Sequence, residues 1–398
     1  MSTRSRPPGG ARHSRIPPGL FKRALGAPDL LYHVLQAEAA KHVWAPFQKA
    51  VDGRQSAHLR QVSLKITDLC NLRCKTCGQW GETGYNLDKP LSELRARTVS
   101  FERYCEMVDE IAHLRPFYYI WGGEPFIYPK LVPLMAYMKE KGGFVGVVTN
   151  GTFLEAHAQA LVDMQLDQLM LSIDGTPDVH DAIRKQKGCF DKLWRGLDAV
   201  LKARGERPRP FVNILMTVSR DNVDNLVAVA EMLQARGGID LFTVYYSWFT
   251  SRGNGLHHTD VMEQRFGVTP TSWHGYLFFQ GLDTARLQQE VETLKARTWS
   301  FHPMLIPDLD IDQIPLYYGD PTETFGYGGC IQPWIVTEIM PNGDVATCRD
   351  YPDYVCGNIK TESLLSIWNN EKYQRFRSVL KEEGLLPICA RCCGLMGW

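Results

Sequence analysis

The sequence lacks the long apolar runs and the excess of one charge that would mark several classes of protein. No apolar run approaches the roughly 18 residues of a membrane span. The opening MSTRSRPPGG has no apolar segment typical of a secretory signal. Lys plus Arg equals Asp plus Glu at 44 each, so a basic nucleic-acid footprint over the whole molecule is excluded. We therefore expect a cytoplasmic protein with no transmembrane segment and no nucleic-acid partner.

The composition is that of a folded chain. The 398 residues are 44% hydrophobic and 22% charged, which excludes a disordered, collagen-like or coiled-coil protein. This length favours one large catalytic domain with an appendage. Eleven cysteines are present. Because a reducing cytosol disfavours structural disulfides, clustered cysteines indicate metal ligands or redox groups.

The first 60 residues differ from the rest of the chain. Residues 1–28 hold six Lys or Arg and no acid among several Pro and Gly, so we expect a flexible basic tail. Contact of this tail with an anionic partner or a membrane surface is the alternative. Residues 29–60 carry apolar residues at helical spacing and predict an N-terminal helical segment that packs on the following domain.

From residue 61 onward, short β-rich runs alternate with helical patterns. The predicted strands are 62–66, 117–121, 144–148, 169–173, 211–218 and 241–246. The helical patterns are 101–114, 130–141, 155–164, 190–203 and 223–236. This alternation indicates an α/β fold whose parallel sheet is an open sheet or a partial barrel, with chemistry at the carboxyl ends of the strands. We assign 61–250 to this domain and 251–326 to an aromatic-rich insertion or linker.

Unusual residues follow several of these strands. The first strand leads to Cys70, Cys74 and Cys77 in TDLCNLRCKTCGQW. This C-x₃-C-x₂-C spacing of three soft ligands suits a [4Fe–4S] cluster with one open iron. A structural zinc site would instead require four protein ligands and have no open coordination position. The second strand ends in the run Gly122 to Pro125, and the fourth ends near Ser172 and Asp174.

Over about residues 60–250 these motifs, in this order, resemble the radical S-adenosylmethionine (SAM) superfamily. The resemblance implies a partial (βα)₆ TIM-like barrel in which Cys70, Cys74 and Cys77 bind the SAM-ligating [4Fe–4S] cluster. It also implies reductive cleavage of SAM to a 5′-deoxyadenosyl radical that abstracts a substrate hydrogen, in a closed, dry site. A reducing partner such as flavodoxin or ferredoxin is then expected.

The same resemblance implies the SAM contacts. The backbone carbonyls and the Glu carboxylate of the second-strand motif are expected to accept hydrogen bonds from the methionine ammonium. The remaining candidates stand where relatives contact the SAM carboxylate or ribose. Arg184 could instead form a surface salt bridge, and Thr76 replaces a common aromatic residue near adenine. The expected SAM-binding residues are Gly122, Gly123, Glu124, Pro125, Ser172, Asp174, Arg184, Asn213 and Thr217.

A second cysteine pattern lies in residues 327–398. Cys330 and Cys348 stand in a C-x₁₂-G-x₄-C arrangement around a predicted hairpin turn, and Cys389 and Cys392 form a C-x₂-C pair. Four thiolates make a complete ligand set. The pattern resembles the twitch form of the SPASM domain, a small α+β appendage, and implies one auxiliary [4Fe–4S] cluster. A zinc ribbon is the alternative, and Cys356 or Cys393 could be a fallback ligand or a hydrogen donor.

Arg349 and Asp350 directly follow an expected cluster ligand. In twitch-bearing relatives this position faces the active site, where Asp350 could deprotonate a substrate hydroxyl and Arg349 could anchor an anionic group. A salt-bridged hairpin end is the alternative. These two residues are the catalytic candidates.

The favoured function is a radical SAM tailoring enzyme that oxidises, dehydrogenates or epimerises a small metabolite, with a peptide or lipid as other possible substrates. The alternative enzyme is a peptide maturase that forms thioether or C–C crosslinks. A non-catalytic iron–sulfur electron carrier is a third hypothesis, but a carrier has no use for the Gly122–Pro125 motif and an open iron.

Overall fold

Ten strands form one continuous sheet in the computed structural model, which describes residues 28–277 and 281–392. The sheet order is β10-β9-β8-β1-β2-β3-β4-β5-β6-β7. The strands are β1 Gln61–Lys65, β2 Phe117–Trp121, β3 Phe144–Thr149, β4 Gln168–Ser172, β5 Phe211–Thr217, β6 Leu241–Tyr245, β7 His302–Ile306, β8 Val336–Ile339, β9 Asp344–Ala346 and β10 Val355–Asn358.

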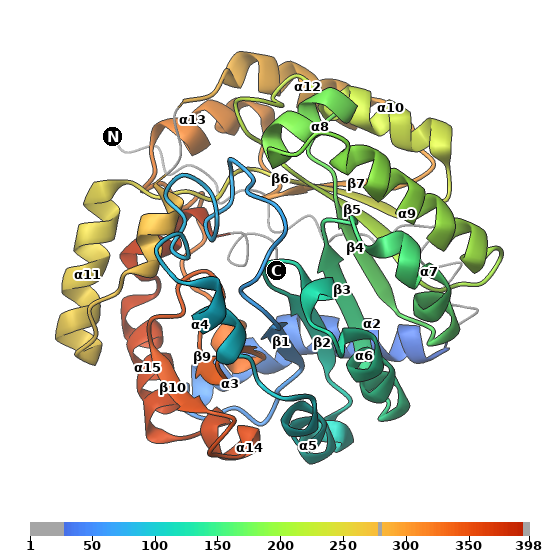
Figure 1. The fold of residues 1–398 in the computed structure, drawn as a ribbon. Helices are drawn as coiled ribbons and strands as arrows, with labels where there is room; N and C mark the ends of the chain where they lie inside the picture. Colours follow the sequence, from blue (N-terminus) through green and yellow to red (C-terminus); the bar gives the residue numbers. More distant parts are fainter. Residues whose placement is uncertain (1–27, 278–280, 393–398) are drawn as a thin grey trace.

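The strands from β8 through β1 to β7 are parallel, and β9 and β10 continue the sheet in antiparallel hairpins. Figure 1 shows this sheet curved around a centre, with helices on its outer side. The predicted parallel α/β barrel is therefore confirmed, and the six predicted strands correspond to β1–β6.

Helices pack on the outer face of the sheet and on the ends of the barrel (Figure 1). The α-helices are α2 Pro28–Ala39, α3 Ala45–Val51, α4 Leu91–Ala96, α5 Phe101–Ile111, α6 Leu131–Glu140, α7 Leu154–Asp163, α8 Pro177–Arg184, α9 Cys189–Arg204, α10 Leu226–Arg236, α11 Arg252–Phe266, α12 Thr284–Ala296, α13 Ile314–Gly319, α14 Leu364–Trp368 and α15 Glu371–Glu383. A π-helical turn, η1 Ala40–Trp44, joins α2 to α3. Short 3₁₀ turns are η2 Ala112–Leu114, η3 Pro125–Ile127, η4 Ser272–Tyr276, η5 Ile311–Gln313, η6 Gln332–Trp334 and η7 Pro387–Arg391.

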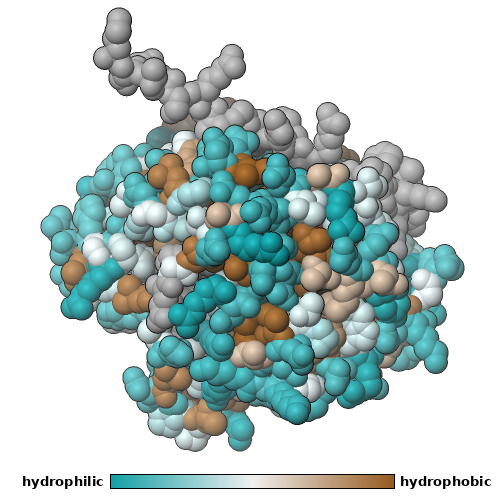
Figure 2. Space-filling model, turned by 90° about the horizontal axis from the view of Figure 1, so that it is seen from above, coloured by the Kyte–Doolittle hydropathy of each residue, from teal (hydrophilic) through white to brown (hydrophobic). Residues whose placement is uncertain are grey.

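The helix α5 illustrates how the sequence specifies these elements. Ser100 caps it by accepting a hydrogen bond from the backbone N–H of Arg103. Its buried residues, Tyr104, Met107, Val108 and Ile111, recur at helical spacing and belong to the main hydrophobic core. On the face seen from above in Figure 2, apolar side chains lie in separate small groups among hydrophilic ones.

Two regions differ from the sequence expectation. The stretch 251–326, expected to be an insertion or linker, contributes β7 to the sheet, where it pairs with β6. This strand was not predicted because it contains Pro303, and proline cannot donate a hydrogen bond to a neighbouring strand. Proline is tolerated chiefly at the edge of a sheet, and β7 is an edge strand. The basic tail expected for 1–28 lies outside the described residues except for Pro28, which begins α2.

The cysteine-rich C-terminal region is joined to the barrel through β8 and a buried arginine. Arg377 on α15 is fully buried and donates to the carbonyl oxygens of Pro333 at 2.7 Å and Arg54 at 3.0 Å. It also donates to Asn369 Oδ1 at 2.8 Å. One side chain therefore connects three separate segments of the chain. None of the helices in the described residues is long and apolar enough to span a membrane.

Arg377→Met should lower the thermal unfolding midpoint of the protein. The substitution leaves buried carbonyls without a donor, each at a cost of about 1–3 kcal/mol. The matched control is Arg195→Met, because Arg195 forms a solvent-exposed ion pair with Glu155 that should contribute less than about 1 kcal/mol. Equal midpoints for the two variants in thermal scans would contradict the role assigned to Arg377.

Candidate active site

A cavity of about 280 Å³ opens at the carboxyl ends of the barrel strands. Its lining comes from the loops after β1 and β2, from β3–β6, and from the segment after β9. At one end lie Cys70, Cys74 and Cys77, and Arg349 and Asp350 also line it. Residues widely separated in the sequence thus line one cavity.

The loop after β1 holds the three front cysteines together at this cavity. The backbone N–H of Cys77 donates to Cys74 O at 3.3 Å, and Lys75 N donates to Ile183 O at 2.9 Å. Burial raises the pKa of the Cys70 thiol to about 12 and that of Cys74 to about 11. Because metal binding requires thiolates, ligation here would release protons.

The glycines after β2 allow two loops to approach closely. A Cβ on Gly122, whose φ is +155°, or on Gly123 would collide with the carbonyl oxygens of Thr67 and Leu69 respectively. Gly123 N donates to Thr67 O and Glu124 N donates to Leu69 O, each at 2.8 Å. The motif therefore holds the segment that leads into Cys70. Both glycines line the cavity.

Glu124 is buried and its carboxylate is already hydrogen-bonded. It accepts from the Thr149 hydroxyl at 2.8 Å, from Asn150 N at 2.8 Å and from Phe126 N at 3.2 Å. Burial raises the pKa of Glu124 to about 7, although these donors lower it. Neither Glu124 nor Pro125 is among the cavity-lining residues, so direct contact of either with SAM stays a prediction. The contacts present give Glu124 the role of joining the ends of β2 and β3.

Arg184 does not form the surface salt bridge that was the alternative interpretation. Its side chain is mostly buried, with Nη2 2.6 Å from Asp174 Oδ2 and Nη1 3.8 Å from Cys74 Sγ. Although burial alone would lower it, the Asp174 carboxylate raises the pKa of Arg184. Asp174 also accepts from Thr217 N at 3.2 Å. Arg184, Asp174, Thr217 and Ser172 all line the cavity.

Asn213 is the predicted SAM contact that lies deepest in the barrel. Its Oδ1 accepts from the Thr243 hydroxyl at 2.9 Å, and it is not among the residues that line the cavity. Asn213 stands near the amino end of β5, four residues before Thr217. Its proposed contact with SAM stays a prediction.

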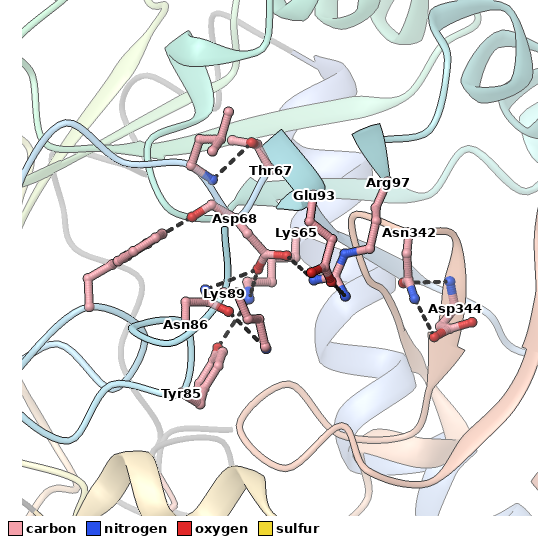
Figure 3. Close-up of polar contacts among 12 residues, drawn as sticks. Lys65, Thr67, Asp68, Tyr85, Asn86, Lys89, Glu93, Arg97, Asn342 and Asp344 are labelled. Carbon is pink, nitrogen blue, oxygen red and sulfur yellow. Dashed lines mark hydrogen bonds and ion pairs between the residues drawn. The ribbon is translucent and has the colours of Figure 1, made fainter. Parts of the chain in front are cut away.

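A polar cluster behind the cysteine loop was not identified from the sequence (Figure 3). Lys65, the last residue of β1, donates to Asp68 Oδ1 at 2.5 Å and to the Tyr85 hydroxyl at 3.1 Å. Asp68 also pairs with Arg97 at 3.4 Å, and its carbonyl accepts from the Trp80 indole at 2.8 Å. No sequence pattern indicates this cluster, because its members are separated by loops. It fixes the segment between β1 and Cys70, and Tyr85 lines the cavity.

A second, largely apolar cavity holds Cys330, Cys348, Cys389 and Cys392. The structure thus brings together the four thiols that the sequence analysis predicted as one ligand set. Burial raises the pKa of Cys348 well above its usual value and that of Cys389 to about 12. Cys356 lies buried on β10 and does not line this cavity. Cys393 lies outside the described residues.

Arg391, between the last two of these cysteines, is a positioning residue that sequence reasoning missed. It is buried, and its Nε donates to Tyr317 O at 2.8 Å. Its guanidinium also donates to Glu323 O and lies 4.4 Å from the Tyr317 ring centroid. These contacts hold the C-x₂-C turn against the segment that follows β7.

Arg349 and Asp350 lie between the two cavities. Arg349 Nε is 3.4 Å from Glu338 Oε1, and its guanidinium lies 4.3 Å from the Tyr119 ring centroid. Asp350 Oδ2 accepts from the Cys392 thiol at 3.6 Å. Burial raises the pKa of Asp350, while Arg349 lowers it. The segment from Cys348 to Asp350 therefore connects the wall of one cavity with the wall of the other.

The donor sets fit iron–sulfur clusters. In the part of the chain that the structure describes, no three His, Cys, Asp or Glu side chains are placed to hold a single metal ion. A four-iron cube offers a separate iron to each thiolate, so its ligands stand further apart than those of one ion. Three thiols at an open cavity suit a cluster with one iron free for SAM, and four enclosed thiols suit a fully ligated one.

Two family models match the chain and together cover more than half of it. The radical SAM superfamily model matches residues 64–233, and the SPASM iron–sulfur cluster-binding domain matches residues 330–393. The chain belongs to the radical SAM superfamily. The matched residues include both cysteine sets, so the implied cofactors are a SAM-ligating [4Fe–4S] cluster, an auxiliary cluster and SAM.

Two curated relatives of this radical SAM protein match it over most of both chains at low identity. A tungsten-containing aldehyde ferredoxin oxidoreductase cofactor-modifying protein from Pyrococcus furiosus is 21% identical, covering 84% of this chain and 87% of the relative. The AdoMet-dependent heme synthase from Nitratidesulfovibrio vulgaris is 23% identical, covering 86% of each chain. SuiB from Streptococcus suis, solved with SAM, shares the fold at a TM-score of 0.58 and 16% identity, covering 90% of this chain and 77% of SuiB. SuiB was also solved with its precursor peptide SuiA.

Replacing Cys70, Cys74 and Cys77 by Ala should abolish SAM cleavage and halve the iron content. Anaerobically reconstituted wild type should carry about eight irons from two four-iron cubes, and the variant about four. Iron analysis and detection of 5′-deoxyadenosine measure both. Undiminished cleavage by the variant would refute the front site, and four irons with one zinc in wild type would refute the auxiliary cluster.

Glu124→Ala should lower both SAM affinity and the thermal midpoint while leaving the iron content unchanged. The substitution leaves the buried donors of Thr149 and Asn150 without an acceptor, at a cost of about 1–3 kcal/mol for each group. Glu124→Gln is the matched variant, because it retains one acceptor oxygen and should fall between Ala and wild type. A loss of SAM affinity at an unchanged thermal midpoint would instead mean that the carboxylate contacts SAM directly.

Proposed function

We propose that this radical SAM enzyme oxidises a small metabolite by removing hydrogen from an alcohol carbon, with Arg349 and Asp350 as the substrate-facing residues. The observation that carries this proposal is the position of Asp350. Its side chain lines the cavity that holds the front cysteines, and its Oδ2 contacts the Cys392 thiol of the second cavity. The space for a substrate thus reaches from one thiolate set to the edge of the other.

The walls near Asp350 suit a compact organic substrate. Tyr85, Trp121, Trp248 and Tyr276 line the same cavity as Asp350. Aromatic faces exclude water and stack on apolar or ring surfaces. A radical needs surroundings from which water and stray hydrogen donors are excluded, because such donors would quench it.

The residues support net oxidation as follows. A secondary alcohol becomes a ketone by losing a hydrogen atom from carbon, a proton from the hydroxyl group and one electron. When bound, the front cluster with SAM supplies a radical that takes the hydrogen atom, and the auxiliary cluster supplies an acceptor for the electron. Asp350 takes the hydroxyl proton. Arg349, held by Glu338 and Tyr119, orients an anionic or carbonyl group of the substrate.

Oxidation is favoured over epimerisation. Epimerisation requires a thiol or another donor to return a hydrogen atom to the substrate radical. In the described part of the chain, the cavity is lined by no cysteine besides Cys70, Cys74 and Cys77, which are the proposed cluster ligands. A flavodoxin or ferredoxin is the proposed source of the electron for SAM cleavage.

A peptide maturase that forms thioether or C–C crosslinks is the second candidate. It is supported by the fold shared with SuiB, whose complex contains the precursor peptide SuiA. The cofactor-modifying protein and the heme synthase, which match over most of both chains, support a small molecule instead. We therefore place the small-metabolite oxidase first.

The two candidates are separated by the substrate fraction that stimulates SAM cleavage. Anaerobic holoenzyme should form 5′-deoxyadenosine several-fold faster with the small-molecule fraction of a cell extract, and protease treatment of that fraction should not remove the effect. Stimulation by a fraction that protease destroys would overturn the small-metabolite proposal in favour of the maturase.

The oxidative step has its own test. With the stimulating fraction, Cys389→Ala should still form 5′-deoxyadenosine but yield no oxidised product, because the electron acceptor is lost. Cys105→Ala is the matched control, since Cys105 lies on α5, away from both cavities. Normal product formation by Cys389→Ala would refute the assigned role of the second cavity.

A further inference from the structure

Helix α11 carries one polar side chain on its buried face. The residues buried on this helix are Gly255, His258, Met262 and Phe266, which follow one another at spacings of three and four and so lie on one side of the helix. Only 2% of the surface of His258 is exposed. Burying an imidazole among apolar groups costs free energy unless its polar atoms are hydrogen-bonded, because they lose their bonds to water.

One ring nitrogen of His258 has no such bond. In the part of the chain that the structure describes, Nδ1 is buried and has no hydrogen-bond partner. Asp353 is the acid whose charge acts on His258, but its carboxylate is bonded elsewhere. Oδ1 of Asp353 accepts from the backbone N–H of Thr271 at 2.8 Å and of Ser272 at 3.1 Å, and Oδ2 accepts from the Ser272 hydroxyl. The fold therefore leaves a buried polar atom unsatisfied, which is unusual in a native protein.

The side chain of His258 lines the cavity that holds the four auxiliary cysteines. Its helix packs against η7, the turn that carries Cys389. The same helix lies beside α15 (Figure 1), where the ring centroids of Phe266 and Phe376 are 5.5 Å apart. Among the described residues that line this cavity, only His258 and Gln332 have a side-chain N–H, and only His258 of the two is buried.

Sulfur is the acceptor that this position offers. The four thiols of the cavity are the expected ligands of the auxiliary cluster that the SPASM match implies. An imidazole carries at least one N–H in either charge state. Hydrogen bonds to the sulfurs of an iron–sulfur cluster are among the factors that set its reduction potential. An N–H that donates to sulfur raises this potential, because it stabilises the more negative, reduced state.

We propose that His258 donates a hydrogen bond to a sulfur of the auxiliary cluster and thereby raises its reduction potential. His258 is a positioning residue here and not a ligand, because four thiolates already complete the ligand set. The inference requires the auxiliary cluster but not the proposed oxidation of an alcohol. It applies equally to an enzyme that acts on a peptide.

A redox titration of the anaerobic holoenzyme, monitored by electron paramagnetic resonance, tests the proposal without any substrate. SAM distinguishes the two clusters, since it should change only the signal of the cluster with an open iron. His258→Phe removes the N–H and should lower the potential of the auxiliary cluster by about 59 mV, which is a tenfold change in the one-electron equilibrium constant. Its iron content should equal that of wild type.

Three further variants separate hydrogen bonding from packing. His258→Asn and His258→Gln each retain an amide N–H, and at least one of them should return the potential toward the wild-type value. His257→Gln is the matched control, because His257 is the exposed neighbour of His258 on α11. This control should keep the wild-type potential.

Three results would overturn the proposal. The first is an unchanged or higher potential in His258→Phe, or an equal decrease in His257→Gln. The second is one and the same lowered potential in the Phe, Asn and Gln variants, which would assign the change to packing. The third is the loss of about four irons from all three His258 variants, which would make His258 a ligand or a structural residue. Because no substrate is present, these outcomes are independent of the test for alcohol oxidation.

Discussion

The parallel pairing of β8 with β1 is the constraint on which the active site depends. The carboxyl end of β1 leads to Cys70, and the hairpin from β8 to β9 leads to Cys348. Because these strands are neighbours in one sheet, both cysteine sets are fixed to a single framework. The register places Glu338 of β8 beside Ser63 of β1, inside the barrel, where Glu338 meets Arg349. A shift of register would turn Glu338 outward and separate it from Arg349.

Buried charges around the cavity are paired with one another. Lys65 pairs with Asp68 three residues further on, Arg184 on α8 pairs with Asp174 after β4, and Arg349 after β9 pairs with Glu338 on β8. Buried ion pairs contribute little net stability, since desolvation opposes the attraction between the charges. Breaking one is costly, however, because it leaves a buried charge without a partner. These pairs therefore fix the positions of the loops that carry the cysteines.

The sequence predicted the parts of this protein that depend on local patterns. The strands β1–β6 followed from apolar runs between helical patterns, and Cys70, Cys74 and Cys77 followed from their spacing. The set of Cys330, Cys348, Cys389 and Cys392 was also predicted, and the structure places all four in one cavity.

Features that depend on long-range contacts were not predictable. The addition of β8 to β1 joins residues about 275 positions apart, and no periodicity encodes such a pairing. The hydrogen bonds that Glu124 accepts from Thr149 and Asn150 at the end of β3 were not predicted, because only the tertiary structure brings these groups near. Arginine side chains are usually exposed, so the sequence alone does not indicate a positioning role for Arg391. Its burial against Tyr317 in the structure shows that role.

The most direct test of the account is an anaerobic crystal structure of the reconstituted protein with SAM, in which anomalous scattering locates the iron. We predict two four-iron clusters, one bound by Cys70, Cys74 and Cys77 with SAM on its open iron, and one bound by Cys330, Cys348, Cys389 and Cys392. Asp350 should lie between them. A single cluster, a zinc ion at the second site, or an auxiliary cluster with ligands other than these four cysteines would contradict it.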